Sequence, residues 1–310
     1  MLFLCFLLVV LSSGTELRVE VRNSEVWLIR DSEERKLTND GKSKLQAVLS
    51  PSLKRIAYYE QCPTTENCTP SVVILDLEGR RIDSFAPTSQ AVPAGEPCAS
   101  ILSIAWTRDN AIAAECHINP SLSEYIETNL ATRQTVRDLF GFNFLASPDG
   151  QGVAHVGWIP HFAPPYAQSN YLQIDNLVVY PLPKGRTPVE LKDLAEPPNV
   201  VDNVDEQGLI FEGIHEFTPE MAWSPNSQRI ALIDCTYDWM ANHARTLTPG
   251  DGVESNRRCS VAVVSRKGEV TLFPLEKSTR DDSSMPRLAW ISPKRLSLET
   301  RDGKKTFTLP

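Results

Sequence analysis

Short apolar runs alternate with polar turns along the whole chain, and one combination of them recurs. An apolar run ends at a Ser-Pro dipeptide or its equivalent, and a second apolar run follows a few residues later. Good copies lie at residues 47–57 and 221–231, and weaker copies begin at residues 104, 144 and 288. Runs bounded in this way by Gly, Pro, Asn and Asp predict strands, so the fold class is all-β. Repetition of one such unit is typical of a radially repeated fold.

Each of the first four repeats accommodates four strands, the number found in a propeller blade. The predicted strands are residues 44–50, 55–61, 71–77 and 80–85 for blade one, 101–106, 111–117, 124–131 and 134–138 for blade two, 142–146, 152–158, 172–180 and 187–191 for blade three, and 220–223, 228–234, 260–265 and 269–274 for blade four. These blade names refer to the sequence repeats throughout.

The two ends of the chain supply further strands. They are residues 17–21, 25–29 and 35–38 at the N-terminus and residues 287–290, 295–299 and 306–309 at the C-terminus. Together they exceed one blade, so we expect N- and C-terminal strands to pair and close the ring. The sequence therefore predicts a single β-propeller over residues 15–310, with five blades and with six as the alternative. Trp223 and Trp290, beside the Ser-Pro turns, are expected to pack between blades.

The overall composition is that of an ordinary globular protein with an acidic surface. Of 310 residues, 41% are hydrophobic and 23% are charged, which is enough to bury a sizeable core. The net charge is −8, and no cluster of Lys or Arg offsets it. This balance argues against a nucleic-acid or anionic-membrane partner, because both require a basic surface.

The first residues of the chain predict export. Residues 2–11 are wholly apolar and are followed by Ser12, Ser13 and Gly14. A bilayer-spanning helix needs about 20 apolar residues, so this stretch is too short to insert as a membrane anchor. It fits the apolar region of a signal peptide over residues 1–14, and the protein would then be periplasmic or secreted. A buried first strand is the alternative.

Six cysteines remain after this segment, and the repeat pairs them. In blades one and four, one cysteine follows the second strand and another precedes the third strand, so the two cysteines of each blade are expected to be neighbours. The remaining two cysteines flank a hairpin of blade two symmetrically and are expected to lie opposite each other across it. The predicted disulfides are Cys62–Cys68, Cys98–Cys116 and Cys235–Cys259. Disulfides form in oxidising compartments, which agrees with export. Six separate buried thiols in a cytosolic protein are the alternative.

The best repeats resemble a known bacterial family. Residues 147–154 read Ser-Pro-Asp-Gly followed by Val-Ala, and residues 223–231 read Trp-Ser-Pro-Asn followed by Arg-Ile-Ala. This pattern is similar to the TolB-type repeat of bacterial propellers, and the likeness covers most of residues 25–300. Blade two lacks the Ser-Pro, and the fifth repeat, which begins at residue 288 and is called blade five, carries an extra residue, Ile291. The resemblance implies the propeller fold, whereas the function of the family is not carried over, because we expect no counterpart of the N-terminal domain of TolB or of the hydrolase domain of propeller peptidases.

Loop lengths indicate where function lies. The predicted long connections, which all emerge on one face, are residues 61–70, 86–99, 159–171, 192–219, 235–259 and 275–285. The opposite face has tight turns. Because binding residues concentrate in loops on a rigid scaffold, the long-loop face is the predicted site.

Aromatic residues in two of these connections suit the capture of a protein or peptide partner in the cell envelope. The predicted binding residues are Trp158, His161, Phe162, Tyr166, Trp239 and His243. The alternative is that these side chains fasten long loops to the scaffold. A purely structural module within a larger complex is a further possibility, and the oligomeric state is left open.

Catalytic chemistry has weaker support in the sequence. No catalytic residue, cofactor or metal site is assigned, because the five histidines lack metal-ligand spacing and no Gly-x-Ser-x-Gly motif occurs. The alternative function is a carbohydrate-active propeller, which requires carboxylates about 5–10 Å apart. Glu220 on an inner strand and the loop acids Asp202, Asp205 and Asp238 are the candidates.

Overall fold

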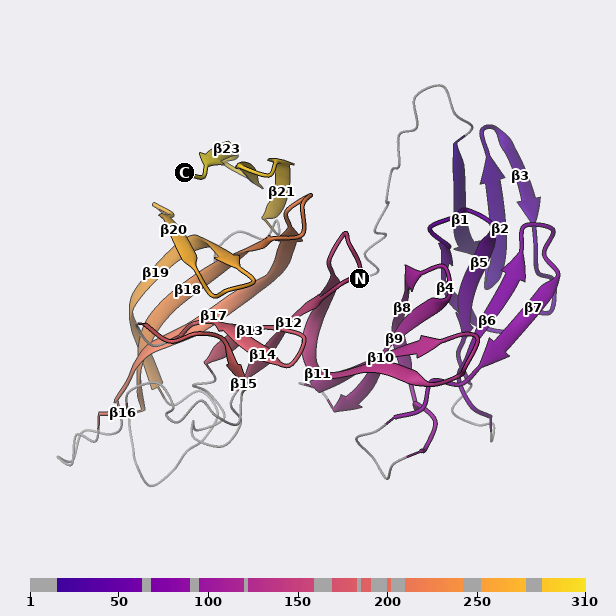
Figure 1. Cartoon of the computed structure of the whole chain (residues 1–310), viewed down its shortest axis with the longest axis horizontal. Helices are drawn as coiled ribbons and strands as arrows, with labels where there is room; N and C mark the ends of the chain where they lie inside the picture. Colours follow the sequence, from indigo (N-terminus) through magenta and orange to yellow (C-terminus); the bar gives the residue numbers. More distant parts are fainter. Residues whose placement is uncertain are drawn as a thin grey trace. The chain divides into compact units, whose positions relative to one another are not determined.

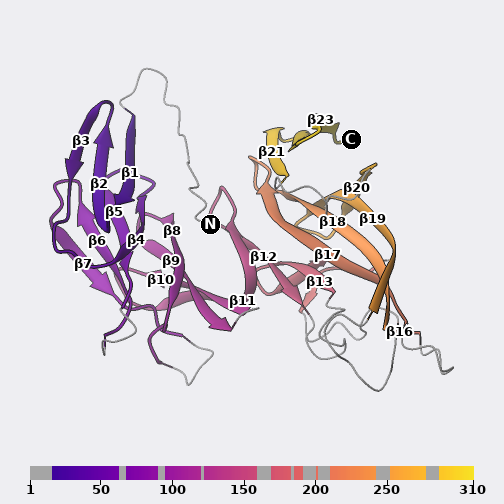
Figure 2. The same ribbon diagram turned by 180° about the vertical axis from the view of Figure 1, so that it is seen from behind.

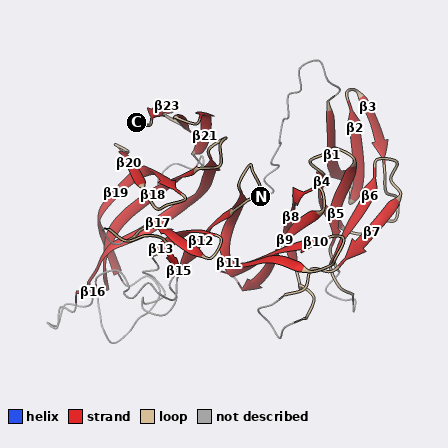
Figure 3. Cartoon of the chain, in the orientation of Figure 1, coloured by secondary structure: helices blue, strands red, loops and turns tan. Residues whose placement is uncertain are grey.

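The computed structural model describes residues 16–62, 68–89, 95–119, 122–158, 169–182, 185–190, 200–201, 210–241, 252–276 and 286–310. The chain divides into two compact units, residues 1–140 (unit 1) and 141–310 (unit 2). All regular elements in these ranges are strands, and none of the described residues is helical (Figure 3). Within the same ranges we find no helix that could span a membrane. The prediction of an all-β fold is therefore confirmed.

Unit 1 contains the strands of blades one and two and the N-terminal strands (Figure 1). Its strands are β1 (Leu17–Arg22), β2 (Glu25–Arg30), β3 (Glu33–Lys36), β4 (Lys44–Leu49), β5 (Arg55–Glu60), β6 (Ser71–Asp76), β7 (Arg81–Phe85), β8 (Ile101–Arg108), β9 (Ala111–Asn119) and β10 (Leu122–Asn129). The strands β4–β7 form a four-stranded antiparallel meander, as expected of a blade.

One strand, β11 (Thr135–Ala146), crosses the boundary between the units. Unit 2 then contains β12 (Val153–Trp158), β13 (Asn170–Ile174), β14 (Leu177–Tyr180), β15 (Val189–Glu190), β16 (Val200–Val201), β17 (Ile210–Trp223), β18 (Arg229–Ala241), β19 (Gly252–Ser265), β20 (Val270–Pro274), β21 (Arg287–Ser292), β22 (Arg295–Thr300) and β23 (Gly303–Thr308). Successive strands are neighbours in every sheet.

The core follows the period of two that strands impose on side chains. In β18, Ile230 and Leu232 belong to one buried cluster, whereas Ala231 and Ile233 belong to another. Strand β5 divides its side chains between two clusters in the same way. Both faces of the central strands are therefore buried, which explains their continuous apolar runs.

A tryptophan next to the inner-strand turn links neighbouring sheets. The indole N–H of Trp223 donates to the carbonyl oxygen of Leu145 (2.9 Å), and Trp290 makes the same bond to Ala222 (2.9 Å). Trp106 bonds to Val48 (3.2 Å) at the equivalent place in unit 1. The predicted packing of Trp223 and Trp290 between repeats is confirmed, and the hydrogen bond explains why Trp is used.

Four predictions of strands and loops need correction. Residues 172–180 were expected as one strand, but they form the antiparallel pair β13 and β14, joined by a tight turn in which Asp175 has a positive φ of 52°. Residues 134–138 and 142–146 were expected as separate strands, but β11 runs through both without interruption. Gly141 lies within this strand where the chain closely approaches β12, and a Cβ atom there would lie 2.5 Å from the Val156 carbonyl oxygen, so a larger residue does not fit. The connections 192–219 and 235–259 were expected to be loops, yet β17, β18 and β19 continue far into them.

Two further predictions concern the extra residue of blade five and the strands at the two chain ends. The register of β21 and β22 shifts between Trp290 and Ser292, so Ile291 is accommodated in a bulge and is 49% exposed. The strands β1–β3 and β21–β23 form separate three-stranded sheets. The number of blades and the pairing of the chain ends stay predictions.

Candidate functional site

Three strands of unit 2 extend beyond the sheet to form an arm. We define the arm as residues 210–217 of β17, 235–241 of β18 and 252–259 of β19; it is drawn in orange tones in Figures 1 and 2. Strand β20 pairs only with Ser260–Val264 of β19. Cross-strand pairs such as Phe211 with Trp239 and Trp239 with Glu254 continue the ladder through the arm. An ordered ladder therefore replaces much of two predicted loops.

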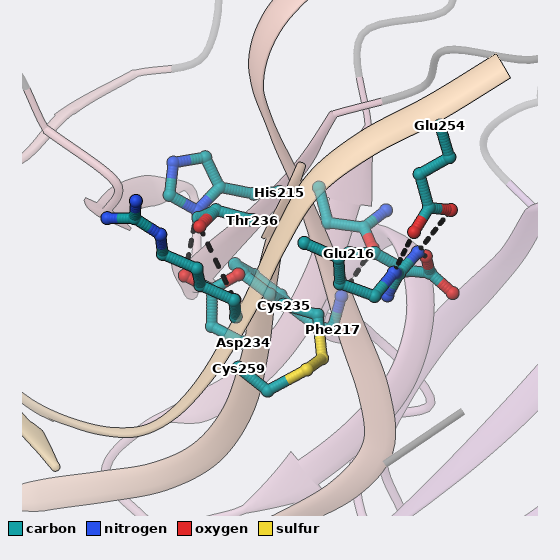
Figure 4. Close-up of a disulfide and its surroundings, with 11 residues drawn as sticks. His215, Glu216, Phe217, Asp234, Cys235, Thr236, Glu254 and Cys259 are labelled. Carbon is teal, nitrogen blue, oxygen red and sulfur yellow. Dashed lines mark hydrogen bonds and ion pairs between the residues drawn. A yellow bond between two sulfur atoms is a disulfide. The ribbon is translucent and has the colours of Figure 1, made fainter. Parts of the chain in front are cut away.

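A disulfide closes the root of the arm. Cys235 and Cys259 are directly opposite on β18 and β19, with Cα atoms 4.0 Å apart (Figure 4). Both cysteines are buried. The bonds Cys62–Cys68 and Cys98–Cys116 are also present, so all three predicted pairings are confirmed.

A buried polar cluster lies beside this disulfide. Asp234, only 3% exposed, occupies the end of the apolar row that contains Ile230 and Leu232. Its Oδ2 atom accepts a hydrogen bond from the Tyr180 hydroxyl (2.6 Å) and contacts His215 Nδ1 (2.8 Å). Two donors on one oxygen hold the carboxylate in place and offset part of the cost of burying it.

The cluster ties strands of neighbouring sheets together. Tyr180 ends β14, whereas His215 and Asp234 belong to β17 and β18. The phenol of Tyr180 also stacks on Phe217, with ring centroids 6.0 Å apart. Burial raises the pKa of Tyr180, and the neighbouring Asp234 charge raises that pKa further. Tyr180 therefore stays a neutral hydrogen-bond donor at physiological pH.

Side chains of the preceding sheet also satisfy the backbone of β17 at the arm root. The His215 N–H donates to Ser169 Oγ (3.2 Å), and the Phe217 N–H donates to Asn170 Oδ1 (2.9 Å). This segment of β17 pairs in regular register with β18, but on its other edge β16 reaches only Ile210 and Phe211, so the N–H groups directed away from β18 have no strand partner among the described residues. The two side chains supply replacement acceptors and fix the arm root in position.

On the arm itself, charged and aromatic side chains form a compact group. The Arg257 guanidinium lies over the Tyr237 ring, 4.6 Å from its centroid, and forms ion pairs with Glu216 and Glu254. Trp239, opposite Glu254 on the neighbouring strand, has its indole nitrogen buried without a hydrogen-bond partner. The arm thus presents aromatic and charged side chains whose positions are fixed by ion pairs and by the contact between Arg257 and Tyr237.

The predicted binding residues are only partly within the described chain. Trp239 lies on the arm, and Trp158 ends β12, where it pairs with Asn170. The other four, His161, Phe162, Tyr166 and His243, lie outside the described residues. The aromatic site therefore stays a prediction.

The candidate acids for carbohydrate chemistry can be placed in part. Asp238 accepts hydrogen bonds from Asn256 Nδ2 and the Gly213 N–H, which lower its pKa. Burial raises the pKa of Glu220, which accepts a weak bond from the Leu288 N–H (3.4 Å). Asp202 and Asp205 lie outside the described residues. Asp238 is thus held as a carboxylate within the arm, an environment that suits a structural acceptor.

A close pair of carboxyl groups occurs elsewhere, in unit 1. Burial raises the pKa of Asp138 to about 7, and its hydrogen bond with Glu124 adds to the shift. Glu124 is fully buried and also accepts a bond from Ser89 Oγ (2.6 Å). Groups in direct hydrogen-bond contact are closer than the carboxylates of glycosidases, which leave room for a sugar or water. Among the described residues, no three His, Cys, Asp or Glu side chains are grouped so that they could hold a metal ion.

Sequence reasoning missed Tyr180, His215 and Asp234. A usable signal was present, because Asp234 interrupts a strand that otherwise reads Ile-Ala-Leu-Ile and directly precedes Cys235. A polar residue at the end of a buried row needs partners. Its partners come from 19 and 54 residues away along the chain, and no local pattern identifies them.

Comparison with known proteins gives structural neighbours only. No protein-family model matches the chain, and no curated protein matches it significantly. The fold is similar to TolB from Acinetobacter baumannii, with 16% identity, a TM-score of 0.36, and coverage of 96% of this chain but 64% of that one. It is similar to the β-propeller domain of the Trilobed protease from Pyrococcus furiosus (9% identity, 94% of this chain, 76% of that one, TM-score 0.43). It is also similar to putative TolB from Agrobacterium tumefaciens (10% identity, 84% and 77% coverage, TM-score 0.35). The structural neighbours are thus TolB and other β-propeller proteins, all at low sequence identity, and the chain spans less than two thirds of the first of them.

Proposed function

We propose that this chain is an exported, non-catalytic β-propeller that binds a protein or peptide partner of the cell envelope through its long-loop face. Five blades closed by pairing of the N- and C-terminal strands are the arrangement we propose for the ring. The binding surface consists of the arm together with the predicted aromatic residues around Trp158 and Trp239. No metal or cofactor is part of this proposal.

The observation that carries the proposal is that several independent interactions hold the arm in one conformation. A disulfide, a buried Tyr180–Asp234–His215 cluster and the Arg257 ion pairs all fix a ladder that extends beyond its sheet. A surface ordered before binding loses little conformational entropy when a partner docks. Aromatic residues and Arg are the side chains that contribute most to such interfaces.

Export is supported by the cysteines. Three disulfides occur within the described residues, and cross-links of this kind persist in oxidising compartments. We propose that residues 1–14 act as the signal peptide. Fractionation of a bacterial host that expresses the full chain tests this step, with the mature protein expected in the periplasm or medium.

Site-directed photo-crosslinking tests the binding face. A photoreactive amino acid replaces Trp239 on the arm, and in a matched control it replaces Gln228, an exposed residue in a tight turn at the other end of the same strand. We expect a discrete cross-linked envelope protein or peptide from position 239 and none from position 228. The same adduct should decrease several-fold when Arg257→Ala is added.

Two results would overturn the proposal. Equal cross-linking from positions 228 and 239 would mean that the arm is not a specific binding surface. Release of sugars from envelope glycans by the purified chain, lost in Asp238→Asn, would instead support the carbohydrate-active alternative.

A further inference from the structure

The outer strands of the described sheets differ in their charge. Strands β3, β7, β15 and β23 each carry Lys, Arg, Asp or Glu residues. Strand β20, with the sequence Val-Thr-Leu-Phe-Pro, carries none. Charged side chains on an outer strand oppose pairing with another chain. Strand β20, which ends its sheet, lacks charged side chains and has only Pro274, its last residue, as a feature that opposes pairing.

The side chains of β20 divide cleanly between two faces. Phe273 packs inward against Phe307, with ring centroids 5.0 Å apart. On the other face, Val270 is 40% exposed and Leu272 is 51% exposed. Pro274 continues this exposed row. The outer strand therefore shows a short, uncharged apolar strip to solvent.

The backbone of β20 is oriented for further pairing. The Leu275 N–H donates to the Cys259 carbonyl oxygen, and the Glu269 carbonyl accepts from the Ser265 N–H, both at 2.9 Å. Odd-numbered residues therefore direct their polar backbone groups toward β19. By strand alternation, Val270 and Leu272 direct their N–H and C=O groups away from the sheet. Pro274, which has no N–H, sits where the missing donor would also face outward.

We propose that β20 pairs antiparallel with β20 of a second copy of this chain, about a two-fold axis at Leu272. In this register, Leu272 exchanges two hydrogen bonds with Leu272 of the other copy. Each Val270 N–H donates to the Pro274 carbonyl oxygen across the interface, which gives four bonds in total. In a full ladder the residue at position 274 would also donate to the Val270 carbonyl oxygen, so Pro274 removes two of the six bonds that this register would otherwise contain.

Side chains also agree with this register. Leu272 faces its own symmetry mate, and Val270 faces Pro274, so the two apolar strips join on one face. Glu276 falls opposite Gly268 and next to Lys267, and both charged side chains are exposed. The two-fold axis produces this complementary contact twice. Opposite charges at the ends of a short apolar pairing fix its register.

The interface is small, so the dimer is weak. One strand pairing contacts less surface than the roughly 1,200 Å² of stable interfaces. We expect a dissociation constant between about 10 µM and 1 mM. The edge of β20 is distinct from the proposed partner surface on the arm, and the dimer does not depend on that function.

Sedimentation velocity of the purified chain over about 5 µM to 1 mM tests the dimer in the range that its size predicts. We expect the weight-average mass to rise toward twice the monomer value. Leu272→Lys should keep the chain monomeric throughout. The matched control is Ile82→Lys, which alters a similarly exposed residue (54%) on the outer strand β7 and should leave dimerisation unchanged.

Two further variants test the register. Glu276→Lys should weaken the dimer several-fold, and Lys267→Glu combined with Glu276→Lys should restore it. Leu272→Cys should form a disulfide-linked dimer on mild oxidation, because Cα atoms of a hydrogen-bonded antiparallel pair lie about 5.5 Å apart.

The proposal is overturned if the wild-type chain stays monomeric over the whole range, or if it dimerises equally well with Leu272→Lys. A dimer without Leu272→Cys cross-linking and without charge-swap rescue would place the interface elsewhere and would also overturn it. A last outcome would also overturn it. If the Leu272 amide of the dilute, monomeric chain exchanges slowly only after envelope extract is added, the β20 edge pairs with a strand of another protein and not with a second copy of this chain.

Discussion

The indole N–H of Trp223 bonds to the carbonyl oxygen of Leu145, 78 residues earlier in the chain, at 2.9 Å. The same bond recurs from Trp290 to Ala222, 68 residues earlier, and from Trp106 to Val48, 58 residues earlier. Each acceptor lies one residue before the position that is equivalent to Trp in its own repeat. The repeat thus builds one hydrogen bond from each of these tryptophans to the neighbouring sheet.

Trp223→Phe should destabilise unit 2. The substitution keeps an aromatic ring but leaves the Leu145 carbonyl without its donor, at a cost of about 1–3 kcal/mol for the lost bond. Urea unfolding followed by circular dichroism measures the change. The matched control is Trp27→Phe, because the Trp27 indole nitrogen is buried without a partner and its loss removes no bond. Equal losses in both variants would contradict the role of the hydrogen bond.

His155 should make the protein less stable in mild acid. Burial lowers the pKa of His155 to about 4, from an ordinary value of 6.5, and the side chain is 2% exposed. The unfolded chain therefore takes up a proton first as pH falls. The contribution of neutral His155 is complete above pH 6.5 and is lost as pH falls through the folded-state pKa, with a total of about 3 kcal/mol.

His155→Phe should remove this dependence, although it loses the contact of Nε2 with the Asp175 carbonyl oxygen. The difference in unfolding free energy between wild type and variant is measured from pH 7 to pH 4 and should shrink. The same substitution at the exposed His117 is the control. A difference that is constant with pH would refute the assignment.

Asp138 should act in the opposite direction. Its pKa is raised to about 7, so its proton is retained in the folded chain and released in the unfolded chain above pH 3.8. The stability that this proton confers is complete below pH 3.8 and is lost as pH rises through about 7. Because Asp138 is partly exposed, we discount the effect to about 1–2 kcal/mol.

Asp138→Asn keeps the shape and removes the titration. Relative to wild type, this variant should become more stable as pH rises from 4 to 8, in thermal melts at fixed ionic strength. Glu78→Gln, at an exposed turn, is the control for a change of charge. A gain that does not depend on pH would show that Asp138 and Glu124 do not share a proton.

How far the sequence predicts this structure depends on whether the information is local. The strand segments, the tight turns and the three cysteine pairs follow from alternation and from equivalence within the repeat, and all three cysteine pairs are confirmed. The arm was missed because stretches such as Cys-Thr-Tyr-Asp-Trp-Met-Ala carry polar residues at the spacing of a strand that is exposed on one face. Such a strand is specified by its partners, and its own pattern resembles a loop. The Tyr180–Asp234–His215 cluster is formed by residues of β14, β17 and β18. The spacing of these residues along the chain does not predict that the three strands come together.

Tyr180→Phe tests whether this cluster holds the arm root. The substitution removes one of two donors to the buried Asp234 carboxylate, and hydrogen bonds to charged groups contribute about 1.5–3 kcal/mol. Tyr59→Phe is the matched control, because the Tyr59 hydroxyl donates to a neutral acceptor, the Leu102 carbonyl oxygen (2.9 Å), and its loss should cost nearer 1 kcal/mol. Urea unfolding measures both costs. Amide exchange at the arm residues Thr236 and Arg258 should also accelerate in Tyr180→Phe and not in Tyr59→Phe, because the first bond anchors β18 where the arm leaves the sheet. Unchanged exchange in Tyr180→Phe would mean that the disulfide and the ladder alone fix the arm.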